Sequence, residues 1–457
     1  LHPEARGWSR RPQLRANLRR GWGRKKRWDY WCVLSDDVIA SLVIAAGTAY
    51  AAHFRRKEIS CPLLTDWEGI RRNPAYKPVV ADAILAGHIN DGYSVYDVPP
   101  TGLDWRESPL SCVTRFPILG TLRHAIWHKQ EPRYTRWTVD HILGYIRAYP
   151  IEEFAGKRSQ EGWRDHFHTA KPWYWCMIPE RLSELSQTVA LIRSSPEVTD
   201  EELLQILHRM LQETGYLRGE MKTWVDLRHN GGCAMIDAMI QACAILEDFL
   251  PARERRTYAA GLAAQYMDQA FYPDGMCVEL TTAYSASVAV TSLRMAYALR
   301  DEKPIHELRE KLAAVVTCTV ALSDPTGRLP SFGDLYAGVL RSYVDPRVSE
   351  WLGLPWATAT PGQKGNPEPP FTAWPAPGQA QWCGYYTMRS GWQPDARYLA
   401  MDGGPWGTTH QHGDKLSFAL TAYGAQFVID PSSTRYSSNE AGAFISRQPS
   451  GFLHNTI

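Results

Sequence analysis

Hydrophobic positions at helical spacing dominate the middle of the chain. From about residue 58 to 325, apolar residues recur every three or four positions, in segments separated by connections rich in Pro, Gly and Asp. The segments predict helices at Glu180–Ile192, Glu201–Thr214, Ala234–Phe249, Ala252–Ala270, Ser285–Arg300 and Ile305–Leu322. Thr199 and Asp200 stand where they would cap the second helix. Successive helices with short links indicate a layered bundle or a toroid of helical hairpins.

The hydrophobic period becomes shorter after a Pro-rich segment. Seven prolines between Pro355 and Pro377 make a poor core, so we predict a linker over residues 355–379. The alternating runs that follow predict strands at Gly384–Arg389, Tyr398–Asp402, Leu416–Tyr423 and Ala425–Asp430. A sheet domain is therefore expected over 380–457, and we expect the chain to hold only its opening.

The first 57 residues differ from the rest. Two extended apolar segments, Trp28–Leu34 and Val38–Phe54, flank turn-forming residues and predict a β-hairpin. Residues 1–28 hold ten Lys or Arg residues against one acid, Glu4, and we favour a solvated basic edge over an anion-binding arm. The predicted organisation is thus a basic N-terminal segment over 1–57, a helical domain over 58–354, the linker and the sheet domain.

Composition narrows the class of protein. The 457 residues exceed the usual size of one compact core, and their 44% hydrophobic and 21% charged content is ordinary for a soluble protein. No apolar run approaches the roughly 18 residues of a membrane span. The net charge of +2 excludes a globally basic nucleic-acid binder, so no nucleic-acid partner is expected. The nine Cys residues are scattered singly, which indicates neither a disulfide scaffold nor a cysteine zinc site.

The densest chemical signal is the sequence GGPWGTTHQHGD at residues 403–414, which precedes an apolar strand. His410 and His412 would face opposite sides of an extended segment, so we expect them to have different tasks. Asp430 follows the next strand and His454 lies near the end of the chain. Imidazole and carboxylate groups on separate elements could hold zinc. The alternative is that they are ordinary loop residues, and for Asp414 we prefer a carboxylate that orients a histidine or caps a turn.

The order of these motifs, closed by HNT at residues 454–456, resembles the heparinase II/III-like polysaccharide lyase family. The resemblance covers about residues 100–457. It implies a multidomain α+β fold, an (α/α) toroid of helical hairpins followed by an antiparallel β-sandwich. It also implies catalysis by His410, a structural zinc ion held by His412, Asp430 and His454, and no organic cofactor. Separately, WSRRP and WGRKKRWDYW near the N-terminus resemble the opening of an uncharacterised bacterial β-rich domain.

Two further motifs, RHNGG at residues 228–232 and GMCVE at 275–279, complete the site by resemblance. Asn230 matches the group that meets the substrate carboxylate, Tyr284 matches the tyrosine that transfers a proton, and His229 and Glu279 are expected to bind substrate. Ser285 departs from the pattern, in which His is frequent. Without the resemblance, Asn230 is a helix cap, Tyr284 is a partly buried aromatic and Glu279 is a surface acid. In this context Glu279 could also position His229, Asn230 or a sugar hydroxyl.

These residue types suit β-elimination from a uronic acid. The reaction removes the C5 proton and expels the oxygen on C4, while negative charge develops on the carboxylate, which an amide such as Asn230 can stabilise. A Tyr and a His provide an acid/base pair. The ordinary pKa of tyrosine is about 10, so Tyr284 needs a neighbour that favours its phenolate before it can act as the base. The sequence does not choose between Tyr284 and His410.

The partner implied by the resemblance is an acidic polysaccharide or oligosaccharide such as alginate, heparan sulfate or hyaluronan, met in the periplasm or outside the cell. The oligomeric state stays open. Trp127, Trp137, Trp173, Trp175 and Trp224 are candidates for stacking on sugar rings, although most are expected in the core. The alternative functions are a toroid-fold glycoside hydrolase, which needs two suitably spaced carboxylates, and a catalytically inactive carbohydrate-binding fragment.

Overall fold

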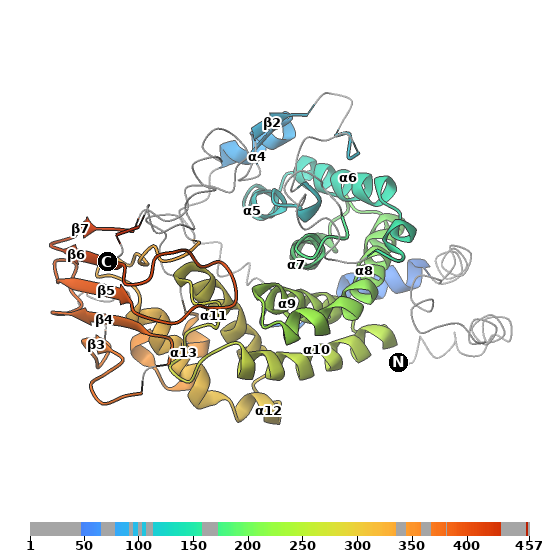
Figure 1. Ribbon diagram of the computed structural model, residues 1–457. Helices are drawn as coiled ribbons and strands as arrows, with labels where there is room; N and C mark the ends of the chain where they lie inside the picture. The colour runs from blue at the N-terminus through green and yellow to red at the C-terminus, as the bar shows by residue number, and fades with distance from the viewer. Residues whose placement is uncertain are drawn as a thin grey trace. The chain divides into compact units, whose positions relative to one another are not determined.

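The computed structural model describes residues 47–64, 78–90, 95–98, 103–106, 113–157, 172–334, 344–357, 367–380, 382–430 and 454–455. The chain forms two compact units. The first comprises residues 1–221 and 234–259, and the second comprises residues 222–233 and 260–457. Among the described residues, a five-stranded sheet lies in the second unit (Figure 1).

Most of the long helices come before residue 270. They are α4 (Pro78–Leu85), α5 (Leu119–Lys129), α6 (Pro132–Ala148), α7 (Met177–Ile192), α8 (Asp200–Asp226), α9 (Asn230–Ile245) and α10 (Leu250–Gln269). Short 3-10 turns at Val113–Arg115 and Ile151–Phe154 and a two-stranded ribbon, β1 (His88–Asn90) with β2 (Val95–Asp97), accompany them. The predicted helices of this region are confirmed, with ends that differ by a few residues except at α8, which continues to Asp226.

The start of α8 shows why it begins where the sequence predicts. The Thr199 hydroxyl accepts a hydrogen bond from the Glu202 amide at 3.2 Å, and the Glu202 carboxylate accepts one from the Thr199 amide at 3.0 Å. This reciprocal pair satisfies two amide groups that would otherwise lack helical partners. Thr199 is thus the cap, while Asp200 is the first residue of α8 and pairs with Arg55.

The first unit contains a buried ion cluster around Glu213. Arg181 and Arg209 donate to the Glu213 carboxylate at 2.9 and 2.6 Å, and the Tyr145 hydroxyl donates to it at 3.0 Å. The side chains of both Arg181 and Glu213 are 0% exposed. The remaining guanidinium nitrogens of Arg181 donate to the carbonyl oxygens of Thr114 and Pro172 at 2.6 and 2.8 Å. Such a cluster fixes several separated segments in one arrangement, because any shift would leave a buried charge unpaired.

The second unit joins the later helices to the sheet. Its elements are α11 (Thr282–Ala298), α12 (Lys303–His306), α13 (Arg309–Ala321), α14 (Pro346–Leu352), a 3-10 turn at Pro355–Ala357, β3 (Ala373–Trp374), β4 (Tyr385–Arg389), β5 (Tyr398–Asp402), β6 (Phe418–Ala422) and β7 (Ala425–Val428). The strands pair antiparallel in sequence order. The predicted strands are confirmed, whereas the single helix predicted over 305–322 is divided into α12 and α13.

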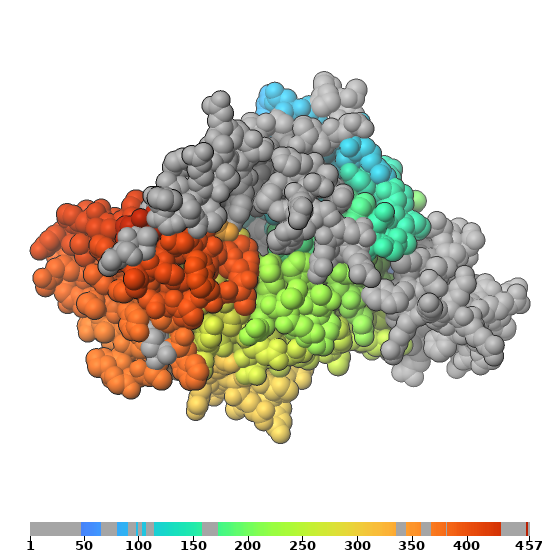
Figure 2. Space-filling view, viewed as in Figure 1, coloured from blue at the N-terminus to red at the C-terminus, as the bar shows by residue number. Residues whose placement is uncertain are grey.

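One face of the sheet covers the helices of its own unit. Tyr385, Tyr398, Ala400 and Ala419 belong to a buried cluster with residues that include Leu280, Leu322 and Phe332. The hydroxyl groups of Tyr385 and Tyr398 donate to the carbonyl oxygens of Leu280 and Leu322, each at 2.7 Å. Buried apolar area supplies the stability, and the two hydroxyl contacts fix the register of sheet against helix. In the space-filling view, the part of the chain that contains the sheet is coloured orange to red (Figure 2).

The second strand of the predicted N-terminal hairpin is wrong at residues 47–56, which are helical. Ala51 and Phe54 are three residues apart and both 0% exposed. Burial at this spacing is typical of a helix, whereas a strand would bury alternate residues. The remainder of the hairpin and the basic residues 1–28 lie outside the described residues. Strand β3 lies inside the predicted linker, and the predicted domain boundaries stay predictions. No described helix is both long and apolar enough to cross a membrane.

Candidate active site

The connection from β5 to β6 carries the histidine motif and is fixed at several points. The Thr408 amide donates to the carbonyl oxygen of Val278 at 3.1 Å, and the Gln411 side chain donates to that of Leu280 at 2.8 Å. A Cβ on Gly407 would meet the carbonyl oxygen of Glu279 at 2.4 Å, so only glycine allows this approach. The loop 403–412 is thereby held against the segment that leads into α11.

His410 is the centre of the arrangement. Its Nδ1 donates to the Glu279 carboxylate at 2.9 Å, and its ring stacks on that of Tyr284 with centroids 3.8 Å apart and planes 13° from parallel. The other carboxylate oxygen of Glu279 accepts the backbone amide of Asn230 at 2.6 Å, at the first residue of α9. The predicted catalytic residues are therefore brought together: Glu279 joins Asn230 to His410, and Tyr284 stacks on His410.

Backbone strain accompanies this arrangement. Arg228, Leu280 and His410 have φ angles of 56°, 54° and 62°, in the left-handed region that residues other than glycine rarely adopt. Each such residue costs about 1–3 kcal/mol and persists only where its surroundings enforce it. All three lie next to, or within, the group that holds His410.

The predicted substrate-binding residues His229 and Glu279 have structural contacts instead. His229 precedes α9, and its Nδ1 accepts the amide of Gly231 at 2.9 Å, so it is the cap that we assigned to Asn230. Burial lowers the pKa of His229 to about 4, against the opposing effect of the Glu279 carboxylate, so the ring is neutral and its remaining proton is on Nε2. Glu279 is 0% exposed, which excludes a surface acid and does not fit direct contact with substrate.

The side-chain oxygen of Asn230 has no hydrogen-bond partner among the described residues. This oxygen is also buried. Leaving such a group unpaired costs about 1–3 kcal/mol in general. A native protein keeps an unpaired buried polar group mainly where a ligand or water completes it, which agrees with a binding role for Asn230.

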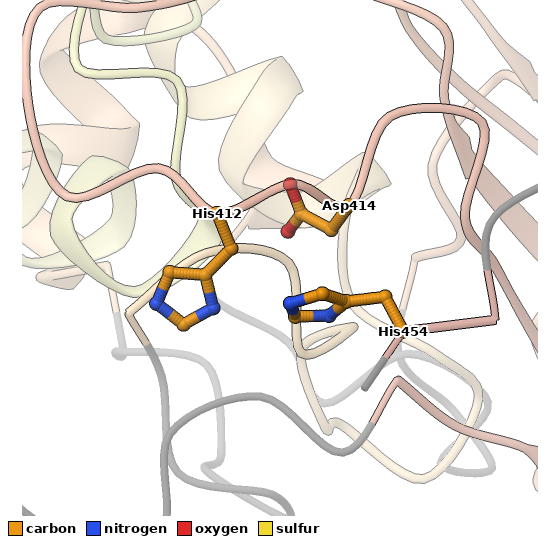
Figure 3. Close-up of side chains that lie close together, drawn as sticks. All are labelled: His412, Asp414 and His454. Atoms are coloured by element: carbon orange, nitrogen blue, oxygen red, sulfur yellow. The ribbon is translucent and has the colours of Figure 1, made fainter. Parts of the chain in front are cut away.

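A second group of side chains forms a candidate metal centre. His412, Asp414 and His454 each offer a ligand atom, and these atoms lie within 4.8 Å of one another (Figure 3). His412 Nε2 is hydrogen-bonded to the Asp334 carboxylate at 2.7 Å, and His454 Nδ1 to the Asp430 carboxylate at 2.7 Å. A carboxylate on the far nitrogen orients an imidazole and fixes its tautomer, as is usual around metal-binding histidines.

The donor atoms fit a zinc ion. His412 Nδ1 and one Asp414 oxygen are buried and form no hydrogen bond within the described parts of the chain. Two imidazoles and a carboxylate are ordinary zinc ligands. Burial raises the pKa of Asp414, and the nearby negative charge of Asp430 adds to this shift, which the Gly333 amide and the two imidazoles oppose. A cation would remove the penalty of this buried charge.

The roles of Asp414 and Asp430 in the candidate metal centre differ from those that we expected. Asp430, which we expected as a ligand, lies on the far nitrogen of His454, whereas Asp414, which we expected to orient a loop, contributes an atom to the cluster. Asp414 also accepts the Gly333 amide at 2.6 Å, so the turn-capping role applies as well. A Cβ on Gly333 would meet Thr281 and the carbonyl oxygen of His410 at 2.7 and 2.9 Å, and this close approach was not visible in the sequence.

The tryptophans that we chose for sugar stacking are not the exposed ones. Trp224 is 2% exposed and packs edge-on against His229, and the other four are at most partly exposed. The most exposed indole rings among the described residues are those of Trp406 and Trp382, at 64% and 54%. Both precede or follow strands of the sheet domain.

Three family models match the chain. The model described as heparinase II/III N-terminus matches residues 42–352, and the one described as heparinase II/III-like, C-terminal, matches residues 375–457. A domain of unknown function (DUF2804) matches residues 1–55, where we noted a resemblance to an uncharacterised domain. The first two models together account for both the helical region and the sheet.

Similar proteins agree with the fold. A heparin-sulfate lyase of Pedobacter heparinus is 24% identical over 283 residues, which are 59% of this chain and 41% of that protein. Heparinase III has a TM-score of 0.68 at 16% identity, covering 88% of this chain and 65% of that one. The heparan sulfate lyase HepC of P. heparinus has a TM-score of 0.59 at 19% identity, covering 92% and 68%. The chain therefore spans about two thirds of these structures, and the predicted fold, a helical toroid followed by an antiparallel β-sandwich domain, is confirmed.

Proposed function

Because the chain belongs to the heparinase II/III family, we propose that it is a polysaccharide lyase that cleaves uronic acid-containing chains by β-elimination. The observation that carries the proposal is that His410 and the backbone amide of Asn230 meet on the buried carboxylate of Glu279, while Tyr284 stacks on the His410 ring. One similar protein is named a heparin-sulfate lyase, which makes a glycosaminoglycan the first substrate class to test.

Asn230 is proposed to bind the carboxylate group of the uronic acid. When C5 loses its proton, negative charge grows on that carboxylate, so a donor held at the right position stabilises the transition state more than the ground state. The Asn230 backbone is held by Glu279 at the start of α9. In this proposal the side-chain NH2 group donates to the substrate carboxylate, and the side-chain oxygen, which has no partner within the described residues, is an acceptor that a substrate hydroxyl group or water can satisfy.

His410 and Tyr284 are proposed to transfer the protons. A carboxylate only accepts hydrogen bonds, so Glu279 keeps a proton on Nδ1 of a neutral His410 and leaves the lone pair of Nε2 for the substrate. The rings are stacked face to face, and an imidazole lone pair lies in the plane of its ring. His410 is therefore poorly placed to activate the Tyr284 hydroxyl, and we propose that the two groups act separately. One removes the C5 proton, and the other protonates O4 as the C4–O bond breaks and the C4–C5 double bond forms.

The glycoside hydrolase alternative needs two carboxyl groups that reach the substrate. The carboxyl group that contacts His410 is that of Glu279, which is 0% exposed and accepts hydrogen bonds on both oxygens. This arrangement suits a positioning group and does not suit an acid or nucleophile that must touch a sugar.

We also propose a structural zinc ion held by His412, Asp414 and His454, with Asp334 and Asp430 orienting the two imidazoles. Its contribution would be to join the 403–414 loop to the segment at His454. The assignment is supported by His412 Nδ1 and one Asp414 oxygen, which are buried and have no hydrogen-bond partner in the described part of the chain. Metal analysis of the purified protein checks it, and a protein that binds no zinc after loading would refute it.

The reaction has a direct test. Elimination leaves a double bond conjugated with the carboxylate, which absorbs ultraviolet light, while hydrolysis leaves no new chromophore. We expect unsaturated products from at least one of heparan sulfate, hyaluronan and alginate. Replacement of Tyr284 by Phe removes only the hydroxyl and should lower kcat about 10²- to 10⁴-fold with a small change in KM.

Tyr297→Phe is the matched control, because it removes the same atom from the same helix α11 away from His410. It should keep the activity of the unaltered protein. Reducing ends without an unsaturated chromophore, or full activity in Tyr284→Phe, would contradict the proposed mechanism.

We also propose that the protein is periplasmic or secreted, because such polymers lie outside the cytoplasm. Cell fractionation checks this location.

A further inference from the structure

Trp406 is exposed on a loop that is otherwise held tightly. Its side chain is 64% exposed, although it lies between Gly404 and Gly407, which both contact other backbone segments closely. A Cβ on Gly404 would meet the carbonyl oxygen of Cys383 at 2.1 Å. The Gly404 amide donates to Asp402 at 3.0 Å, and the Gly407 amide donates to the Gln411 side chain. A large aromatic ring is thus exposed to solvent on a backbone that these contacts hold in place.

A cation lies beside this ring. Lys415 Nζ is 5.6 Å from the centroid of Trp406, and it pairs with the Asp402 carboxylate at 2.9 Å. Asp402 is 0% exposed, so the ion pair holds the ammonium group in place over the exposed ring. A ring face next to a fixed ammonium group offers both an apolar surface and a positive charge within reach of one ligand.

The ring belongs to the same loop as His410. The two residues are four positions apart, so their Cα atoms are at most about 14 Å apart even if the chain is fully extended. Gly407, the next residue after Trp406, lies against Glu279, which holds His410. A ligand on Trp406 would therefore be a close neighbour of a group that reacts at His410.

We propose that Trp406 and Lys415 form a binding subsite for an acidic saccharide, next to the position of the sugar ring that is cleaved. The apolar face of a sugar ring stacks on the indole, and the carboxylate or sulfate of that ring, or of the adjoining one, is attracted to the ammonium group. The subsite rests on the proposed function, because it assumes an acidic saccharide chain as substrate.

Equilibrium binding to the intact protein tests the stacking. In a Tyr284→Phe background, in which turnover should be much slower, calorimetric titration gives the Kd of size-defined uronic acid oligosaccharides. Trp406→Ala should weaken binding at least about tenfold, or about 1.4 kcal/mol. Trp406→Phe, which keeps a smaller ring, should have a Kd between that of its parent and that of Trp406→Ala. This variant also controls for the possibility that Ala disturbs the loop.

Tyr423→Ala is the matched control. Tyr423 is 75% exposed and follows β6 at the end of the sheet opposite to Asp402, because Tyr398 pairs with Thr421 while Met401 pairs with Phe418. Its removal should leave Kd unchanged. Equal weakening by Tyr423→Ala and Trp406→Ala, or no weakening by Trp406→Ala, would overturn the subsite.

The charge requirement is tested separately. Lys415→Met alone would leave the buried Asp402 carboxylate unpaired, so it is combined with Asp402→Asn, which removes both charges and keeps an oxygen for the Gly404 amide. The double variant should lose affinity for the acidic oligosaccharide and keep its affinity for the same oligosaccharide after its carboxyl groups are reduced and any sulfate groups are removed. Equal loss for both ligands would overturn the role of Lys415.

The two proposals can fail independently. If the unaltered protein releases unsaturated products and Trp406→Ala binds as well as its parent, the subsite is wrong and the lyase function stands. If no acidic polysaccharide yields unsaturated products but the oligosaccharides bind in a Trp406-dependent way, the reaction is wrong and the subsite stands.

Discussion

Two buried glutamates organise the two units, and they do so in different ways. Glu213 in the first unit accepts hydrogen bonds from Arg181, Arg209 and Tyr145, and every guanidinium nitrogen of Arg181 finds an acceptor. Glu279 in the second unit accepts hydrogen bonds, among the described residues, from only an imidazole and a backbone amide. The first glutamate closes a network of charges, while the second holds a histidine whose other nitrogen is left for another partner.

The difference lies in what surrounds each glutamate. Around Glu279 and in the nearby histidine cluster, the structure describes buried atoms of Asn230, His412 and Asp414 without a hydrogen-bond partner among the described residues, and three strained backbone positions. A complete network contributes rigidity, whereas incomplete groups on a rigid frame are suited to bind something else. The comparison predicts that changes in the first cluster act on stability and changes in the second act on activity.

The largest effect should come from Glu213→Gln. Burial favours a higher pKa for Glu213, but the guanidinium groups of Arg181 and Arg209 outweigh burial and lower that pKa. The carboxylate is therefore charged, and it serves as the counter-ion of both arginines. Its loss would leave Arg181 and Arg209 as buried charges without a counter-ion. We expect the free energy of unfolding to fall by about 3–5 kcal/mol. Chemical denaturation measures it, with kcat per folded molecule unchanged.

The control for this change is Glu153→Gln in the same unit. Glu153 pairs with Arg106 at 3.0 and 2.5 Å, but both side chains are more than a third exposed, so the loss should be under about 1 kcal/mol. Similar losses in the two variants would show that burial does not distinguish the clusters as we argue.

Glu279→Gln should have the opposite effect to Glu213→Gln: turnover should fall strongly, while stability should change less. A Gln carbonyl accepts from only one of the two donors, and its amide group then favours the His410 tautomer with the proton on Nε2, which cannot act as a base. We expect kcat to fall about 10²-fold or more while oligosaccharide Kd changes little. Nitrogen chemical shifts of the His410 ring report the tautomer, a signal that a merely structural role would not move.

Glu310→Gln, an exposed change at the start of α13, serves as the control and should have full activity. If Glu279→Gln keeps its turnover, or if it loses stability in the same measure as Glu213→Gln, then Glu279 is one more structural charge and the contrast fails.

The smallest of these effects concerns the candidate zinc centre. Metal bound only to the folded state adds stability, so a strong chelator should lower the free energy of unfolding by an amount on the order of 2 kcal/mol. Thermal unfolding with and without the chelator measures it, and restored zinc should reverse the change. His412→Ala should make the protein insensitive to the chelator, whereas His306→Ala, an exposed change, should leave the response intact. A chelator response that persists in His412→Ala would place the metal elsewhere.

Much of the secondary structure could be read from local patterns. Periodicity predicted most of the helices from residue 180 to 322 and the strands from 384 to 430 within a few residues, because an element must bury one face and its period records which residues lie there. The exceptions are the end of α8, which continues to Asp226, and the helix predicted over 305–322, which is divided into α12 and α13. It failed at residues 47–56, where an apolar run of mixed pattern fits a strand or a helix equally and tertiary contacts of Ala51 and Phe54 decide.

The types of the site residues were determined by the sequence as well. The motifs around His229, Asn230, Glu279, Tyr284 and His410 predicted a site, and the structure brings these residues together. Their individual contacts could not be predicted in the same way. Glu279 and His410 are 131 positions apart, and only the packing of loop 403–412 on the segment before α11 decides that Glu279 is buried and holds an imidazole.

The carboxylates of the metal cluster show the same limit. The resemblance assigned Asp430 as a zinc ligand, and we preferred an orienting or turn-capping role for Asp414. The fold places Asp430 on the far nitrogen of His454 and Asp414 among the ligand atoms. The exposed ring of Trp406 was likewise hidden among 18 tryptophans. Residue type and period are local properties that a sequence carries by itself. Which atom faces which depends on distances between remote segments, and those are set by the packing of the whole unit.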